Sequence, residues 1–271
     1  MSRDIPPGTA HGTAPNYGSD PAPVAEPYPE DTLAGLRSDA EQVLARYPQP
    51  RSALLPLLHL VQSVDGHVST RGIEFCAGLL GLTAAEVSGV ATFYTQFKRR
   101  KNGRYTVGVC TNTLCAVMGG DEIWRQVSDH LGIGHDETTE DGMITLERVE
   151  CNAACDYAPV VMTNWEFFDN QTPETTIALV DALRTGRPVR PTRGADTVAV
   201  FTEISRVLAG FSDGRAGEGP GAGEASLRGT LLAKECGWEA PKPTAAKPEP
   251  KPGGKHSSAE ESGVSHGKVV P

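Results

Sequence analysis

Two close pairs of cysteines constrain this chain more than any other feature of its sequence. Cys110 and Cys115 enclose the segment CTNTLC, and Cys151 and Cys155 enclose the segment CNAAC. The segments that precede them, RYTVGV and MITLERVE, have the composition and alternation of β-strands. If these two strands are neighbours in one sheet, their exit loops emerge at the same edge, and the four thiolates can converge there.

Such a group of thiols could form disulfides, bind a zinc ion or bind an iron–sulfur cluster. Disulfides would close two very small loops, and a reducing compartment disfavours them. A structural zinc ion needs a tetrahedron of thiolates, but zinc knuckles usually have C-x2-C turns, and neither pair has that spacing. A [2Fe–2S] cluster needs two thiolates on each of its irons, and wider loops can spread their sulfurs around a binuclear core. The spacing therefore favours an iron–sulfur cluster and leaves zinc and disulfides as alternatives.

Composition and charge narrow the classes of partner and compartment. The chain has 271 residues and a formal net charge of −9, which opposes binding to nucleic acid or anionic lipid. No window approaches the roughly 18 to 20 apolar residues of a membrane span. The N-terminus has no apolar stretch typical of a signal peptide. We therefore expect a cytosolic protein without direct membrane insertion.

The sequence pattern divides the chain into four parts. Residues 1–30 are rich in Pro, Gly and Ala and are predicted to be a disordered arm. Residues 31–100 carry apolar residues at helical spacing and are predicted to form a helical bundle, with Ser69 or Thr70 as one cap and a Thr83–Glu86 capping box as another.

Residues 101–190 follow the order β-α-β-β-α and are predicted to form a small α/β domain like the core of thioredoxin. Thioredoxin chemistry would need a C-x-x-C motif, which this sequence lacks. Residues 191–271 are predicted to be a flexible Pro/Gly-rich extension with a possible short helix over 196–209. Cys76 is expected to be a buried small hydrophobe, and Cys236 an incidental thiol.

Four motifs in order resemble one known family. They are LPLLHLVQSVDGHVS, GVATFYTQF, GVCTNTLC and ETTEDGMITLERVECNAACDYAPVVMTN. Together, over residues 31–190, they are similar to the 24-kDa iron–sulfur subunit family of NADH:quinone oxidoreductase, respiratory complex I. The resemblance implies a thioredoxin-like [2Fe–2S] domain of α/β (α+β) class behind a helical bundle, with one [2Fe–2S] cluster bound by Cys110, Cys115, Cys151 and Cys155.

The resemblance also implies a function and partners. The isolated chain would be a one-electron carrier without catalytic residues of its own, within an enzyme whose flavin subunit holds FMN and NADH. It would lie in the peripheral arm, on the cytoplasmic face of a bacterial inner membrane. One alternative is the equivalent subunit of an NAD-linked formate dehydrogenase or bidirectional hydrogenase. A further alternative is a zinc-stabilised adaptor.

Overall fold

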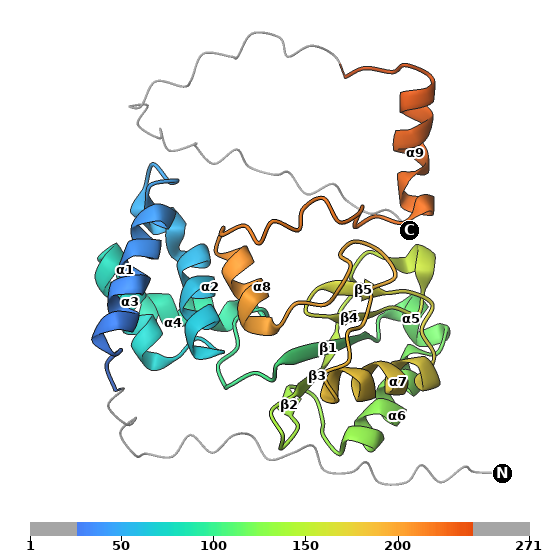
Figure 1. Ribbon diagram of the computed structural model, residues 1–271, viewed down its shortest axis with the longest axis horizontal. Coiled ribbons are helices and arrows are strands. Elements are labelled where there is room, and N and C mark those ends of the chain that lie inside the picture. Colours follow the sequence, from blue (N-terminus) through green and yellow to red (C-terminus); the bar gives the residue numbers. More distant parts are fainter. Residues whose placement is uncertain (1–25, 241–271) are drawn as a thin grey trace, which may run out of the picture. The chain divides into compact units, whose positions relative to one another are not determined.

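The computed structural model describes residues 26–240 in two compact units that divide after Ser226. The predicted disorder of residues 1–25 and of the tail from Pro241 lies outside the described residues. The first unit contains a bundle of helices and a mixed sheet (Figure 1). Within residues 26–240 no single helix has the length and apolar composition to cross a membrane, although the bent pair Thr70–Leu80 and Ala84–Phe93, at 118°, passes that test together.

The helical bundle forms where the sequence has apolar residues at helical spacing. Its elements are α1 (Glu30–Leu44), η1 (Pro50–Ala53), α2 (Leu54–Asp65), α3 (Thr70–Leu80) and α4 (Ala84–Phe93). Ser69 caps α3 by accepting a hydrogen bond from the Gly72 N–H, and Thr83 and Glu86 form the predicted capping box of α4. Gly66 ends α2 with a left-handed backbone, φ +71°. The predicted helix ends are thus confirmed.

The bundle begins slightly earlier than the sequence indicated. Tyr28 falls in the predicted disordered arm, yet its side chain is buried and its hydroxyl donates to Asp65 at 2.7 Å. The guanidinium of Arg71 lies 4.4 Å from the Tyr28 ring and pairs with Asp65 at 2.6 Å. An aromatic residue next to a buried carboxylate and a cation therefore orders the chain before α1.

The sheet has five strands in the order β2-β3-β1-β4-β5. They are β1 (Tyr105–Cys110), β2 (Glu137–Thr138), β3 (Ile144–Val149), β4 (Val161–Thr163) and β5 (Glu166–Phe168). β1 and β3 are parallel neighbours, and the other pairs are antiparallel. This confirms the assumption that placed the two cysteine pairs at one edge. The two-residue strand β2 was not predicted, because its short polar segment carries no strand pattern.

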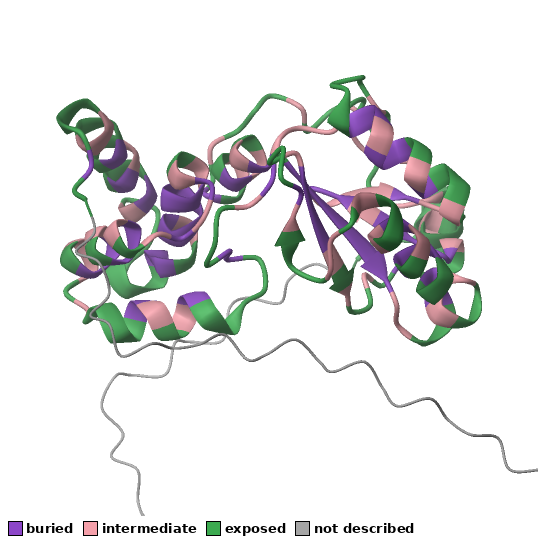
Figure 2. Ribbon diagram, turned by 90° about the horizontal axis from the view of Figure 1, so that it is seen from below, coloured by how far each residue is buried: buried purple, intermediate pink, exposed green. Residues whose placement is uncertain are grey.

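Helices cover one face of the sheet. These helices are α6 (Gly120–Leu131) and α7 (Pro173–Arg184), and with the strands they enclose a core that includes Val107, Leu146 and Leu183. Figure 2 shows the central strands largely in purple, and β1 is buried along its whole length. Both helices of the predicted β-α-β-β-α order are present, and Pro173 stands at the first position of α7, where its missing N–H costs nothing.

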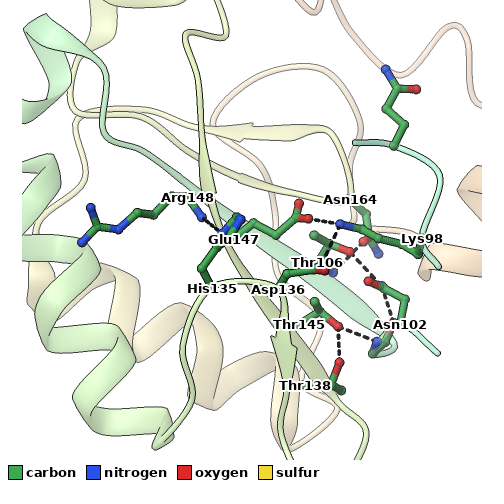
Figure 3. A network of polar contacts seen from close by, with 12 residues as sticks. Lys98, Asn102, Thr106, His135, Asp136, Thr138, Thr145, Glu147, Arg148 and Asn164 are labelled. Atoms are coloured by element: carbon green, nitrogen blue, oxygen red, sulfur yellow. Dashed lines mark hydrogen bonds and ion pairs between the residues drawn. The ribbon is translucent and has the colours of Figure 1, made fainter. Parts of the chain in front are cut away.

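The opposite face of the sheet is polar. Lys98, in the connection between α4 and β1, lies over this face with a nearly buried side chain and pairs with Glu147 of β3 and with Asp136 (Figure 3). A cavity of about 590 Å³ lies on this side, between residues 94–99 and 147–152. Lys98 is the first residue of the basic run at 98–101. Its ion pairs hold the connection between α4 and β1 against the sheet.

Part of the predicted C-terminal extension packs onto the bundle. Helix α8 (Phe201–Leu208) lies within the range 196–209 for which a helix was predicted, and it packs against α2. Phe201 is buried beside the bundle and stacks on Trp165 at 6.0 Å. The side chain of Gln62 in α2 donates to Ser205 of α8 at 3.3 Å. Residues 201–209 therefore form part of the first compact unit. The division of the chain into four parts at residues 30, 100 and 190 remains a prediction.

The second unit begins within the last helix. α9 (Glu224–Glu235) has no buried residue, and beyond Ser226 it presents Leu231 and Leu232, both about half exposed. Cys236 follows the helix as an exposed free thiol.

Candidate metal centre

The first cysteine loop, residues 110–115, starts inside the sheet. Cys110 is the last residue of β1, and Cys115 lies in the short helix α5 (Thr113–Val117). Both side chains are only 3% exposed. The segment after β1, expected to be an exit loop, contains a helical turn at Cys115, because the Asn112 side chain accepts a hydrogen bond from the Thr113 N–H and starts the turn there.

The second cysteine loop, residues 151–155, lies on the surface. Cys151 follows β3 directly, and Cys155 begins the 3-10 turn η2 (Cys155–Tyr157). Their Sγ atoms are 3.6 Å apart, and both residues are exposed. The Ala153 N–H donates to the Cys151 sulfur at 3.3 Å, and Ala153 has a left-handed backbone, φ +53°. The loop thus turns its backbone back towards its own sulfur.

The two loops meet because their strands are paired. Cys110 is opposite Val149 in the parallel β1–β3 ladder, so both chains leave the sheet at the same edge. Burial raises the pKa of Cys115 to about 11, with further contributions from the neighbouring Cys110 and Cys155 thiols, and the Val160 N–H opposes them by donating to Cys115. Sulfurs from both loops are therefore within electrostatic reach of one another.

A glycine allows the close approach of the helix behind the first loop. A Cβ atom on Gly120 would lie 2.5 Å from the Cys110 carbonyl oxygen and 2.8 Å from the Cys115 carbonyl oxygen. Only glycine fits at the start of α6 without moving this backbone.

The surroundings contribute groups that the sequence did not identify. The N–H groups of Ala153 and Val160 reach cysteine sulfurs, a role that sequence cannot reveal because every residue other than proline carries an N–H. Leu114, Val117 and Met118 on or beside α5 are 44%, 80% and 55% exposed and form an apolar rim beside the first loop. Their short apolar run was visible in the sequence, but its exposure was not.

The remaining two cysteines are Cys76 in the helical bundle and Cys236 in the second unit. Cys76 is fully buried in the bundle core, as expected, and burial raises the pKa of its thiol to about 12. Cys236 is exposed in the second unit. Cys76 therefore has no part in the candidate centre.

The donor set fits a binuclear cluster. Within residues 26–240, no three Cys, His, Asp or Glu side chains are arranged to hold a single metal ion. The thiols lie instead as two pairs, all of them free, on two adjoining loops. Two irons that each take two thiolates match this arrangement, and backbone N–H groups already point at two of the sulfurs.

Comparisons with known proteins agree with this fit. The family model for thioredoxin-like [2Fe-2S] ferredoxins matches residues 40–184. A subunit of the NADH-quinone oxidoreductase of Mycobacterium tuberculosis is 59% identical over 215 residues, which are 79% of this chain and 85% of that protein. NADH-quinone oxidoreductase subunit 2 of Thermus thermophilus is 37% identical over 150 residues, 54% of this chain and 83% of that protein.

Among solved structures, the NAD+-reducing [NiFe]-hydrogenase in its air-oxidized state aligns with a TM-score of 0.45 and 19% identity, over 50% of this chain and 23% of that chain.

Proposed function

The chain belongs to the thioredoxin-like [2Fe–2S] ferredoxin family, and we propose that it is the iron–sulfur electron-transfer subunit of an NADH:quinone oxidoreductase, with its cluster held by the two cysteine loops. The observation that carries this proposal is the convergence of two pairs of free thiols at the ends of the parallel strands β1 and β3. Cys110 and Cys115 would ligate one iron, and Cys151 and Cys155 the other.

When bound, the cluster supplies one-electron redox chemistry. The residues of this chain hold it in place and adjust its potential. The first loop is anchored by β1 and by the packing of α6 at Gly120. The N–H groups of Ala153 and Val160 donate to sulfur, and such donors stabilise the more negative, reduced state and so raise the reduction potential.

The proposed partner is the subunit that carries FMN and oxidises NADH. Support comes from the names of the relatives reported above, which are subunits of NADH-quinone oxidoreductases. The cysteine loops lie at the surface beside the apolar rim of Leu114, Val117 and Met118, so a partner could bring its cofactor close to the cluster. Through this partner the chain would sit at the cytoplasmic face of a bacterial inner membrane.

Single cysteine substitutions test the ligand assignment. Each of Cys110→Ala, Cys115→Ala, Cys151→Ala and Cys155→Ala should lower the iron content and abolish or alter the electron paramagnetic resonance (EPR) signal of the reduced protein. Cys76→Ala is the matched control, because this thiol is buried in the bundle core. A full native signal in any of the first four variants would remove that cysteine from the ligand set.

A further inference from the structure

Residues 191–226, here called the C-terminal segment, follow the part of the chain matched by the family model. Before α8 they run beside the strand β5, and after α8 they contact Asp156 and Tyr157, the two residues that directly follow the second cysteine loop. The segment contacts the region of the cysteine loops at three places, all within the first compact unit.

The first place is the edge strand β5. The Thr192 N–H donates to the Phe167 carbonyl at 2.9 Å, and the Thr192 hydroxyl accepts from the Asp169 N–H at 3.1 Å. These bonds pair the segment with the otherwise open edge of the sheet. Phe167 itself packs against the buried group that contains Cys110, Cys115 and Val160.

The second place is a buried ion pair. The Arg193 guanidinium pairs with Asp169 at 3.1 Å, and the two side chains are only 9% and 8% exposed. The same guanidinium lies 4.1 Å from the centre of the Phe167 ring and 5.4 Å from that of Tyr157 in η2. Arg193 thus joins the edge strand to the turn that contains Cys155.

The third place is the end of the segment. The Ala225 N–H donates to the Tyr157 hydroxyl at 3.1 Å, and the Ser226 hydroxyl donates to the Asp156 carboxylate at 2.6 Å. Gly223 lies so close to Tyr157 that a Cβ atom there would overlap the aromatic ring. Both residues that follow Cys155 are therefore held by the C-terminal segment.

We propose that the C-terminal segment is a clamp on the second cysteine loop that slows release of the cluster, an inference that rests on the proposed function. Cys151 and Cys155 are exposed, but Cys110 and Cys115 are only 3% exposed and lie in one buried group with Ala154 of the second loop. Release of both irons would therefore require the second loop to open, and this opening first breaks the contacts to Asp156 and Tyr157. Arg193, Gly223 and Ser226 are positioning residues, since they act through the loop and touch no ligand sulfur.

The test is the rate at which an iron chelator removes iron from the full-length, cluster-loaded chain under anaerobic conditions. Gly223→Ala should displace the segment from Tyr157 and speed iron release by about fivefold, the change expected from loss of one hydrogen bond of typical strength. Tyr157→Phe, which removes only the acceptor for Ala225, should act in the same direction. Gly217→Ala is the matched control, because a Cβ atom there would meet no neighbour within 4 Å.

A second readout separates a clamp from general destabilisation. Loss of the contact with Tyr157 should also lower the thermal unfolding midpoint of Gly223→Ala slightly, so the comparison is with Cys76→Ala. That change in the bundle core should lower the midpoint too but leave the rate of iron release at the parent value. Equal iron-release rates in Gly223→Ala, Tyr157→Phe and Gly217→Ala would overturn the clamp. Failure of the proposed function itself would be distinct, since the parent chain would then carry no [2Fe–2S] signal.

Discussion

At the scale of single residues, the two cysteine loops would contribute differently to the proposed cluster site. The first loop supplies two buried thiols from a rigid strand and helix, and the second supplies two exposed thiols from a turn. Burial opposes the ionisation of Cys115, so in the proposed site iron would supply the charge that stabilises its thiolate. Cluster binding and the ionisation of this loop are therefore coupled.

A substitution at Gly120 tests whether the close packing of α6 on the first cysteine loop matters for iron binding. Gly120→Ala should push α6 away from the first cysteine loop and lower the iron bound per chain, because the added Cβ would meet two backbone carbonyl oxygens. Gly78→Ala is the control, since it lies in α3 with open space around its Cβ position. Iron and sulfide analysis of the purified variants gives the comparison, and equal iron in both would contradict the role given to Gly120.

The buried side chain of His59 should make the folding stability depend on pH. Its ring is buried against Phe97 at 4.7 Å, and burial lowers its pKa to about 4. The unfolded chain takes up this proton near pH 6.5 and the folded chain only near pH 4, so folding stability falls as the pH drops through that window.

The corresponding loss is about 3 kcal/mol on the scale of 1.36 kcal/mol per pKa unit. Denaturant unfolding at pH 7 and pH 4.5 should show a smaller decrease in stability for His59→Leu than for the parent chain. The same decrease in both would show that His59 is not the titrating group.

At the scale of helices and strands, local patterns predicted the elements but not all their partners. Thr83 with Glu86 and Pro173 marked helix starts because capping depends on residues close in sequence. α5 was missed because five residues are too few for a helical period. The packing of α8 on α2 was missed because it joins residues 143 positions apart, such as Gln62 and Ser205, and sequence spacing carries no such information.

Gln62 tests that packing. Its side chain accepts from the Lys98 N–H at 2.8 Å and donates to Gln96 and Ser205, and it is fully buried. Gln62→Leu leaves these groups unpaired, so the free energy of unfolding should fall by about 2–4 kcal/mol. Gln42→Leu, at an exposed position of α1, should change the free energy of unfolding by less than about 0.5 kcal/mol. Denaturant titration compares them, and equal small effects would mean that Gln62 does not hold α8.

At the scale of the whole molecule, the first compact unit contains a bundle, a thioredoxin-like sheet and the C-terminal segment. The sequence predicted the cysteine set because strand ends and residue types are local features. It did not reveal the clamp by Arg193 and residues 223–226, because these lie in Gly-rich stretches without periodicity.

The proposed NADH:quinone oxidoreductase predicts which proteins should co-purify with this chain. A tagged chain should co-purify with a flavoprotein that oxidises NADH and with membrane subunits, because the relatives reported above are subunits of NADH-quinone oxidoreductases. Metal analysis and flavin fluorescence of the purified complex provide the measurement. A soluble partner that contains molybdenum or nickel would instead support a formate dehydrogenase or hydrogenase.

The most direct measurement of the central claim is the visible and EPR spectrum of the anaerobically purified chain, expressed with iron supplied. Bound by the two cysteine loops, a [2Fe–2S] cluster should give a red-brown protein with two irons and two sulfides per chain. Reduction should produce the EPR signal of one unpaired electron. A colourless protein without that signal, or one that holds a single zinc ion, would contradict the account.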